Sequence, residues 1–600
     1  MAEIDSNNMV KCYLEKPFTS SDIRLKKRQI RKSLLQQDNL VEKRIALLGG
    51  STIGEIKNIL ELFLLKNGIK PIFHEGDYAL FYEESVFENP SLEKFKPDII
   101  YVHTSSKNIT EYPHPSFEAK ERERLLQETF SRFGTAWESL SQKYHCPVII
   151  NNFEQLPYRI MGNADVWHPN GRNRFINDLN YLVYDFVNRK SGIYVNDIHY
   201  LSSRFGLERW FDSANWYLYK YALSLDAIPD LCYNISLIIK SIYGKNKKSL
   251  ILDLDNTLWG GVIGDDGVDN IHLGIETPKG MAYAEFQSYL KSISELGIML
   301  NVCSKNEMDA AKSGFTHPSS ILKSDDFLVF KANWEPKHSN IQAIVKELNI
   351  GIDSVVFVDD NPAERDIVRG FLSDVSVPEM TNPENYIQNL DEKGYFEVTT
   401  LSKDDLQRNE TYKQNSARES AQASFADYSE FLASLKMVNY VGKFTTSTIP
   451  RVTQLINKTN QFNFTTRRYT ETEIQEISES ESYVTLWGRL EDKFGDNGIV
   501  TALIARVEGK RAFIDLWVMS CRVFKRSLEY AMFNTLVSKL RELGVEELIG
   551  LYRPTAKNVI LKDFYSDLGF SRMDSENDDF ILYLNDYKCK DINSMEIRYE

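Results

Sequence analysis

Two aspartates separated by one residue are the first side chains in this sequence that could do chemistry. Asp253 and Asp255 lie in the run Asp253-Leu254-Asp255-Asn256-Thr257, directly after an apolar stretch that predicts a buried strand. In open α/β sheets, ligands bind at the carboxyl ends of the strands. Two carboxylates there can share a substrate, one as nucleophile and the other as general acid/base, as covalent phosphoryl transfer requires.

Three further groups follow in chain order, each at the end of a predicted strand or in the next loop. Ser304 offers a hydroxyl, Lys337 a cation, and Asp359 with Asp360 an acidic pair. A phosphoryl group is doubly negative, so its transfer needs a cation and a metal ion, and adjacent carboxylates suit Mg²⁺. The alternative is that each aspartate only ends a strand or caps a helix. That alternative competes for any one motif, but it does not account for four in order.

The elements that must position these groups come from alternating short apolar runs and helical segments, a pattern typical of α/β domains with parallel sheets. An N-terminal arm, residues 1–40, precedes a first α/β domain, residues 41–235. Its strands are predicted at Arg44–Leu48, Ile69–Phe73, Asp98–Val102, Pro147–Asn151 and Gly192–Val195. A second α/β unit, residues 236–390, has strands predicted at Ser249–Leu254, Ile298–Cys303, Phe327–Lys331 and Ser354–Val358.

A helical linker, residues 391–435, follows the second unit, and Ser402 with Asp405 predicts a capping box in it. Residues 436–585 have α+β character, and 586–600 are expected to be a tail. The predicted elements of the α+β region are strands at Tyr483–Leu486, Ile499–Val507 and Arg511–Met519 and a helix at Ser527–Leu543.

The totals exclude several classes of protein. A net charge of −14 disfavours nucleic acid and anionic membranes as partners, and the basic stretch Arg24–Lys32 is interpreted as a solvated helix face. No apolar window is long enough for a membrane span, and the N-terminus lacks the order of a secretory signal. The cysteines form no CxxC pair: Cys12, Cys146, Cys232, Cys303, Cys521 and Cys589. We expect a cytoplasmic protein with reduced thiols.

The four motifs together resemble the haloacid dehalogenase (HAD) superfamily. The resemblance implies that Asp253 is the nucleophile and that Asp255 is the acid/base. It also implies a phosphoryl-binding set and a Mg²⁺ set: Asn256, Thr257, Ser304 and Lys337 for the substrate, and Asp253, Asp255 (through its carbonyl), Asp359 and Asp360 for the metal. The gaps between the motifs are too short for a cap domain. The glycine-rich run Trp259–Gly267 predicts a flap instead, so either another domain covers the site or the substrate is carried on something large.

The details resemble the FkbH-like group within that superfamily. The strings are DLDNTLWGGVIGDDG, VCSKNE, NWEPK, FVDDNPAER and the later segment Leu455–Arg468, which together span roughly 245–585. This resemblance implies removal of phosphate from 1,3-bisphosphoglycerate and loading of the glyceryl group onto the phosphopantetheine arm of an acyl carrier protein. Other members belong to polysaccharide or lipid pathways. Cys303, next to Ser304, is either a thiol that holds the acyl group or a small apolar residue at a strand end.

The last domain resembles the GNAT acetyltransferases, in which a loop before a helix binds coenzyme A pyrophosphate. Here Arg522 begins that loop, but Lys525 and Ser527 fill the two glycine positions, so we expect weak or absent acetyl-CoA binding. Tyr565 fits the general-acid position of that family, or else is a core tyrosine.

The first domain is weakly similar to SGNH hydrolases, with Ser51 as the nucleophile and His199 as the base. Asn196 stands where their acid is expected, so we predict a binding or scaffolding domain with no esterase activity.

The leading hypothesis is a three-domain FkbH-like enzyme with an SGNH-like α/β domain, a capless Rossmann-like HAD domain and a GNAT-like α+β domain. Its HAD core dephosphorylates a small phosphorylated metabolite or acyl phosphate and, in the favoured form, passes the acyl group to a carrier protein. One alternative is a plain HAD phosphatase in polysaccharide or lipid biosynthesis. Another, from a different class, is a carrier-binding scaffold with a vestigial site. The intact charged HAD positions disfavour the scaffold.

Overall fold

The computed structural model describes residues 13–37, 40–422, 425–555, 557–573 and 579–600. The chain divides into two compact units, Met1–Ile242 and Tyr243–Glu600. Cys12 and the start of the predicted arm lie outside the described residues, and the other five cysteines are free thiols. Over the described part of the chain, no helix has the length and apolar character needed to cross a membrane.

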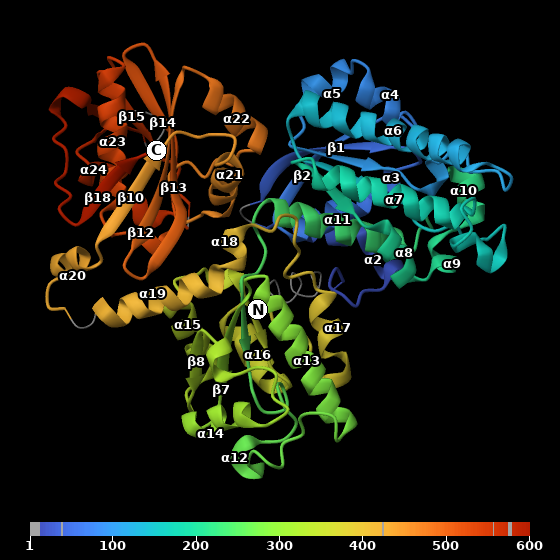
Figure 1. Cartoon of the computed structure of the whole chain (residues 1–600), viewed down its shortest axis with the longest axis horizontal. Helices are drawn as coiled ribbons and strands as arrows, with labels where there is room; N and C mark the ends of the chain where they lie inside the picture. Colours follow the sequence, from blue (N-terminus) through green and yellow to red (C-terminus); the bar gives the residue numbers. More distant parts are fainter. Residues whose placement is uncertain (1–12, 38–39, 423–424, 556, 574–578) are drawn as a thin grey trace. The chain divides into compact units, whose positions relative to one another are not determined.

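The first unit is built on a five-stranded parallel sheet, in which all five predicted strands are confirmed. The strand order is β2-β1-β3-β4-β5, with bounds Ile69–Glu75, Val41–Gly49, Ile99–His103, Val148–Asn151 and Ile193–Asn196. Figure 1 shows α6 (Ala119–Tyr144) on one side of the strands and α3 (Gly54–Lys66) with α11 (Ile228–Ile242) on the other. Side chains that alternate along each strand therefore face two separate helical layers.

The basic stretch lies in α2 (Ser20–Leu34), and it is not simply solvated. Arg24 pairs with Asp226 at 2.5 Å and Lys27 with Glu55 at 2.8 Å. Arg31 pairs with an acid of α3 in the same way, so this helix attaches through ion pairs as well as through its three buried apolar residues.

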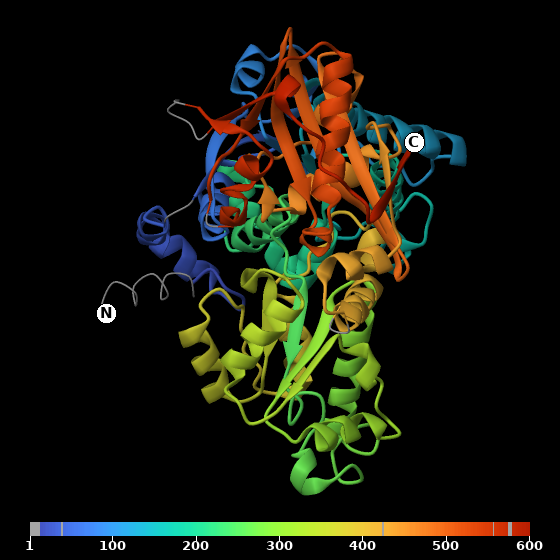
Figure 2. The same ribbon diagram turned by 90° about the vertical axis from the view of Figure 1, so that its left-hand side faces the viewer.

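The second unit begins with a four-stranded parallel sheet, and again each predicted strand is confirmed to within a few residues. The strand order is β8-β7-β6-β9, with bounds Val329–Ala332, Met299–Ser304, Ser249–Leu252 and Val355–Val358. Helix α13 (Pro278–Glu295) packs on one face, and α15 (Lys337–Glu347) with α16 (Pro362–Phe371) on the other. Figure 2 shows these strands between the two helical layers. Helices bury both faces of this sheet, which is why its strands are continuous apolar runs in the sequence.

Helices between that sheet and the next are α17 (Tyr386–Asp391), α18 (Lys403–Leu406), α19 (Arg408–Gln422) and α20 (Tyr428–Ser434). The capping box predicted at Ser402 and Asp405 is confirmed, because each side chain bonds the backbone N–H of the other residue.

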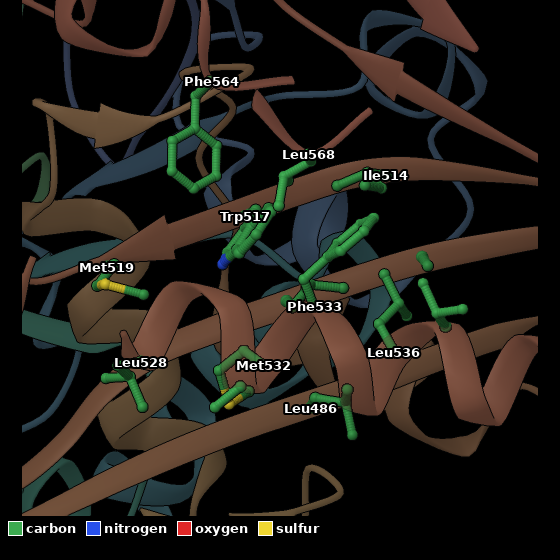
Figure 3. Packing of buried hydrophobic residues seen from close by; sticks show 14 of the residues in the cluster. Leu486, Ile514, Trp517, Met519, Leu528, Met532, Phe533, Leu536, Phe564 and Leu568 are labelled. Carbon is green, nitrogen blue, oxygen red and sulfur yellow. The ribbon is translucent and has the colours of Figure 1, made fainter. Parts of the chain in front are cut away.

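A nine-stranded mixed sheet forms the rest of the chain. Its path is β16-β17-β15-β14-β13-β12-β10-β18, with β11 (Phe462–Asn463) paired to β14. The bounds of the path strands are Ser571–Arg572, Asp579–Tyr583, Glu547–Leu551, Arg511–Met519, Gly495–Glu508, Tyr483–Asp492, Met437–Gly442 and Met595–Tyr599. Helix α23 (Leu528–Glu542) packs Met532, Phe533 and Leu536 against the sheet beside Trp517 (Figure 3).

One prediction about this region was wrong. Residues 586–600 were expected to be a tail, but Met595–Tyr599 is strand β18, which runs parallel to β10. Met595 is buried in the core of this sheet, and Ile597 packs against it. The alternation of these two apolar residues, two positions apart, is what a half-buried edge strand requires.

Candidate active site

The predicted chemical groups of the second unit meet at one edge of the four-stranded sheet. Asp253 follows β6, Ser304 ends β7, Lys337 begins α15 and Asp359 follows β9. The register pairs Leu252 with both Val302 and Val358, so the three strands end at the same level. We refer to Asp253, Lys337, Asp359 and Asp360 as the central site.

A buried ion pair joins the parts of the central site. Nζ of Lys337 lies 3.0 Å from Oδ2 of Asp253 and 2.5 Å from Oδ2 of Asp359. Lys337 is 4% exposed, Asp253 7% and Asp359 0%. Burial alone would lower the pKa of Lys337, but the two carboxylates raise it above its ordinary value, so the ammonium stays charged. A single cation is thereby held against the predicted nucleophile.

Three carboxylates of the central site are crowded together. Oxygen atoms of Asp253, Asp359 and Asp360 lie within 4.8 Å of one another. Burial and the neighbouring Asp253 raise the pKa of Asp359 to about 7 and that of Asp360 to about 6. Lys337 offsets only part of this negative charge. Hard oxygen donors with an excess of negative charge fit a divalent cation such as Mg²⁺.

Asp255 is held apart from this cluster by hydrogen bonds to both of its oxygens. Oδ1 accepts from the Trp259 indole and from the backbone N–H of Ile263, both at 3.0 Å. Oδ2 accepts from Nδ2 of Asn306 at 2.8 Å. Asn306 also reaches Oγ of Ser304 at 3.3 Å, so the predicted acid/base and the predicted phosphoryl-binding hydroxyl share one amide.

The loop after Asp255 is shaped by the flap. Asn256 has a positive φ of 53°, and its carbonyl accepts hydrogen bonds from the hydroxyls of Tyr283 and Tyr386. Its side chain accepts from Gly261 N of the flap at 3.0 Å, so it supports the flap, whereas the prediction had it bind substrate. Thr257 Oγ1 accepts from the backbone N–H of Asp360 at 3.3 Å, which ties two motifs together.

Arg365 supports the central site, although the sequence analysis did not single it out. Its guanidinium donates to the carbonyl oxygens of Asp359 at 2.9 Å and Asp360 at 2.6 Å, and pairs with Glu379 at 2.8 Å. Its side chain is 2% exposed, so a buried guanidinium holds the backbone carbonyls of Asp359 and Asp360 in place. The available signal was its place in the string FVDDNPAER, three residues into a helix that opens with Pro362.

Cys303 is not on the central side of β7. Its side chain belongs to the cluster that contains Ile341, Ile344 and Phe357, and its Sγ faces the carbonyl of Lys337 at 3.7 Å. It is 0% exposed, and burial raises the pKa of the Cys303 thiol to about 12. A neutral buried thiol is a poor nucleophile. This placement argues against Cys303 as an acyl carrier and favours the alternative of a small apolar residue at a strand end.

The two predicted esterase residues of the first unit form no catalytic pair. Ser51 is buried, and its Oγ has no hydrogen-bond partner among the described residues. Nδ1 of His199 lies 3.3 Å from the carbonyl of Phe153. Asn196 donates to Oδ1 of Asn151 at 2.8 Å. The prediction of no esterase activity is consistent with this arrangement.

The residues predicted to bind coenzyme A and to act as a general acid lie in different surroundings in the mixed-sheet region. Lys525 and Ser527 adopt φ values of 68° and 66°, which glycine tolerates and other residues adopt with strain. Arg522 bonds Oγ of Ser520 at 3.2 Å, which leaves it partly buried beside the loop. Tyr565 is 0% exposed among aromatic rings of the core, and burial raises its pKa well above the ordinary value. Tyr565 is therefore a core tyrosine.

The chain is similar to a known protein family and to a solved phosphatase-domain protein. A model of the FkbH N-terminal domain matches residues 45–240. The N-terminal part of BF1531 from Bacteroides fragilis, which contains a phosphatase domain and is complexed with Mg, is 31% identical. That match covers 62% of this chain and 99% of that chain, with a TM-score of 0.58. No curated protein matches the chain.

Two acetyltransferases match a smaller part of the chain. The ribosomal-protein-S18-alanine N-acetyltransferase of Escherichia coli is 18% identical, with 24% of this chain and 91% of that chain covered and a TM-score of 0.20. Ard1 of Thermoplasma volcanium is 16% identical, with 24% and 95% covered and a TM-score of 0.19. Matches of this size and identity indicate nothing about the activity of this region.

The fold and the central site define a member of the HAD superfamily. The chain belongs to the FkbH-like family within it. The family model matches the first unit, in which the sequence analysis found no family signature and only a weak likeness to another fold.

Proposed function

We propose that this protein is a Mg²⁺-dependent phosphatase that acts on a small phosphorylated metabolite or acyl phosphate through an aspartyl-phosphate on Asp253. The observation that carries the proposal is the buried Lys337 bridging Asp253 and Asp359, with Asp360 completing three carboxylates within 4.8 Å. The match to a phosphatase-domain protein complexed with Mg supports it. Asp253, Asp359 and Asp360 would hold Mg²⁺, which supplies positive charge to the transferring phosphoryl group.

The proposed reaction has two steps, formation of the aspartyl-phosphate and its hydrolysis. In the first, an oxygen of Asp253 attacks phosphorus, the bond from phosphorus to the leaving oxygen breaks, and Asp255 donates a proton to that oxygen. In the second, the oxygen of a water molecule attacks phosphorus while Asp255 takes a proton from that water. The bond between phosphorus and the Asp253 oxygen then breaks. Lys337 offsets the charge on the phosphoryl oxygens, and the Ser304 hydroxyl lies beside Asn306 at the same edge.

The test is release of phosphate from an aryl phosphate and from an acyl phosphate, with and without Mg²⁺, by Asp253→Asn. The amide keeps the shape of the side chain but lacks the nucleophilic charge and a metal ligand. We expect activity to fall to the level of buffer. Asp269→Asn, an exposed aspartate after the flap, makes the same charge change and serves as the control. Undiminished Mg²⁺-dependent activity in purified Asp253→Asn would refute the mechanism.

The acyl-transfer form of the function also remains a proposal, and the burial of Cys303 supports a version of it without an acyl group on this thiol. Because Cys303 is buried and burial raises its pKa, the acyl group would not rest on this thiol. The carrier thiolate would instead attack the carbonyl carbon of the acyl phosphate, the bond from that carbon to the phosphate oxygen would break, and inorganic phosphate would leave, a route that bypasses the aspartyl-phosphate on Asp253. Incubation with 1,3-bisphosphoglycerate and a phosphopantetheinylated carrier should then give acylated carrier with wild type and Cys303→Ala alike. A glyceryl adduct on the intact protein that Cys303→Ala abolishes would restore the relay. Phosphate release with no acylated carrier would leave the plain phosphatase.

A further inference from the structure

The two oxygens of Asp255 differ in how much hydrogen-bonding capacity they have left. A carboxylate oxygen accepts about two hydrogen bonds. Oδ1 is saturated, because it accepts from the Trp259 indole and from Ile263 N at 3.0 Å each. Oδ2 accepts one bond within the described part of the chain, from Asn306 at 2.8 Å. Only Oδ2 therefore keeps a free position toward a substrate.

The donors on Oδ1 also fix the plane of the carboxylate. Trp259 is fully buried, its ring lies edge-on to Phe315 at 5.2 Å, and its six-membered ring lies against Gly314. The N–H of Ile263 belongs to the first residue of the short flap helix Ile263–Asp266. Since neither group can follow a rotation of Asp255, the carboxylate has one orientation, and Asn306 decides what Oδ2 faces.

We propose that Asn306 is a positioning residue that directs Oδ2 of Asp255 toward the leaving-group oxygen, so that Oδ2 is the atom that gives and takes the proton. This inference rests on the proposed phosphatase function. Asn306 lies two residues after the end of β7, is 5% exposed, and its Nδ2 is shared between Oδ2 of Asp255 and Oγ of Ser304. The amide thus places the proton donor at a fixed separation from the hydroxyl at the phosphoryl position.

The proton balance follows from that geometry. When Asp253 attacks phosphorus, the electron pair of the breaking bond goes to the leaving oxygen, and that oxygen receives the proton from Oδ2. When water attacks the aspartyl-phosphate, Oδ2 recovers one proton from that water, and Asp253 leaves as a carboxylate. Asn306 donates a hydrogen bond to Oδ2 throughout and exchanges no proton.

The experiment compares leaving groups. Wild type, Asn306→Ala and the isosteric Asn306→Asp are assayed for kcat/KM with 4-nitrophenyl phosphate, which barely needs protonation, and phenyl phosphate, which needs it. General acid help is worth ~10²–10⁴-fold, so we expect a loss of roughly tenfold or more with phenyl phosphate and a much smaller loss with 4-nitrophenyl phosphate. Asn270→Asp makes the same amide-to-acid change on an exposed residue whose side-chain amide donates to the Asp266 carbonyl, and should not change the ratio.

Equal losses with the two substrates would overturn the proposal, because Asn306 would then act only on phosphate binding through Ser304 or on the fold. Unchanged rates in both Asn306 variants would overturn it as well. Thermal unfolding of each variant identifies a folding defect, and the isosteric variant keeps the packing where alanine does not.

A second readout does not depend on activity. The indole N–H signals of the eight tryptophans are recorded by NMR, and Trp259→Phe identifies the one bonded to Asp255. The Trp259 signal should move in both Asn306 variants and stay in Asn270→Asp. If wild type releases no phosphate, the proposed function fails while a moved signal still supports the positioning contact. An unmoved signal refutes that contact whatever the activity.

Discussion

The carboxyl edges of the two parallel sheets treat buried polar groups in opposite ways. At the edge of β6–β9, Lys337 and three aspartates bring charges within 4.8 Å in a buried place. At the edge of β1–β5, the buried side chains of Tyr101, His103, Asn151 and Asn196 are neutral, and the buried acid Glu154, in the loop after β4, accepts hydrogen bonds from the backbone N–H and Oγ of Ser106. Burial lowers the pKa of His103 to about 4, so its imidazole carries no charge at pH 7.

The amides of the neutral edge are paired with one another, whereas Nε2 of His103 and Oγ1 of Thr104 have no hydrogen-bond partner among the described residues. Asn234 of α11 donates to Asn196 at 2.7 Å, Asn196 donates to Asn151 at 2.8 Å, and the hydroxyl of Tyr101 donates to Asn151 at 3.1 Å. Asn151 in turn donates to the carbonyl of Thr104 at 2.8 Å. This chain of amides links a helix to three strands without any ion.

The difference teaches which edge is built for a ligand. Buried dipoles are stable once paired, whereas buried like charges stay unfavourable until an opposite charge arrives. The crowded carboxylates raise the pKa of Asp359 to about 7, a cost that neutral amides do not have. The charged edge is thus the one whose crowded carboxylates a bound cation would stabilise.

The largest effect should follow from removing the charge of Lys337, which lies between Asp253 and Asp359. Lys337→Gln keeps a long polar side chain but removes the positive charge that lies 3.0 Å from Oδ2 of Asp253. Loss of one preorganised group of this kind costs ~10²–10³-fold, so we expect at least that decrease in kcat/KM for phosphate release. Lys305→Gln, an exposed lysine paired with Glu364, is the matched control. A decrease of the same size in both variants would remove the special role of Lys337.

The second effect concerns Mg²⁺ and pH. The folded-state pKa values of Asp359 and Asp360 are raised to about 7 and about 6, above their unfolded values. In the metal-free protein, the contribution of these two acids to stability is therefore fully present below the unfolded pKa of about 3.9 and is lost as the pH rises through their folded pKa values of about 6 and about 7. Since Mg²⁺ needs the deprotonated acids, the Tm increase on adding it should be large at pH 8 and small at pH 5.5.

Binding at 100 times Kd stabilises by about 2.7 kcal/mol. Differential scanning calorimetry at the two pH values measures the Tm increase, and Asp359→Asn should abolish the difference between them. A Tm increase that is independent of pH would contradict the crowding of charges at this edge.

A smaller, purely structural effect is expected at the neutral edge. Asn151→Ala removes the hydrogen-bond partner of the Asn196 amide and of the Thr104 carbonyl, whereas the Tyr101 hydroxyl keeps Nδ1 of His103 at 3.0 Å. Each unpaired buried group costs about 1–3 kcal/mol, so unfolding of the first unit should move to lower denaturant concentration. The kcat of phosphate release should not change. A large loss of activity at unchanged stability would show that this edge also does chemistry.

The smallest expected effect is none. Ser51→Ala removes a hydroxyl that has no hydrogen-bond partner among the described residues, and the acid position near His199 is Asn196. Hydrolysis of short acyl esters should be absent in wild type and in the variant. Robust esterase activity that Ser51→Ala abolishes would show that the two edges are both catalytic.

The local pattern of short apolar runs was enough to predict the strands and to predict that the four motifs lie close together. Short apolar runs bounded by turns predict buried parallel strands, and parallel strands must end at a common edge. Asp253, Ser304, Lys337 and Asp359 therefore had to meet, whatever the details of packing. The capping box at Ser402 was readable for the same reason, because its partner is three residues away.

Packing decided what a residue at that edge faces. Cys303 and Ser304 are neighbours, but alternation along β7 places the thiol in the cluster with Ile341 and Phe357. The strand at Met595–Tyr599 was hidden because an edge strand is short and its pairing partner, β10, lies far away in sequence. Spacing alone carries no information on such partners.

The sequence by itself determined the class of chemistry: an aspartate pair, a hydroxyl, a lysine and an acidic pair, in order at strand ends. Only the tertiary structure decided which oxygen of Asp255 is free, since Trp259, Ile263 and Asn306 reach it from the flap and from another strand. Only it showed that Arg365 holds the acidic backbone from beneath. The physical reason is that strand order follows from local periodicity, whereas hydrogen-bond partners depend on register and packing between distant segments.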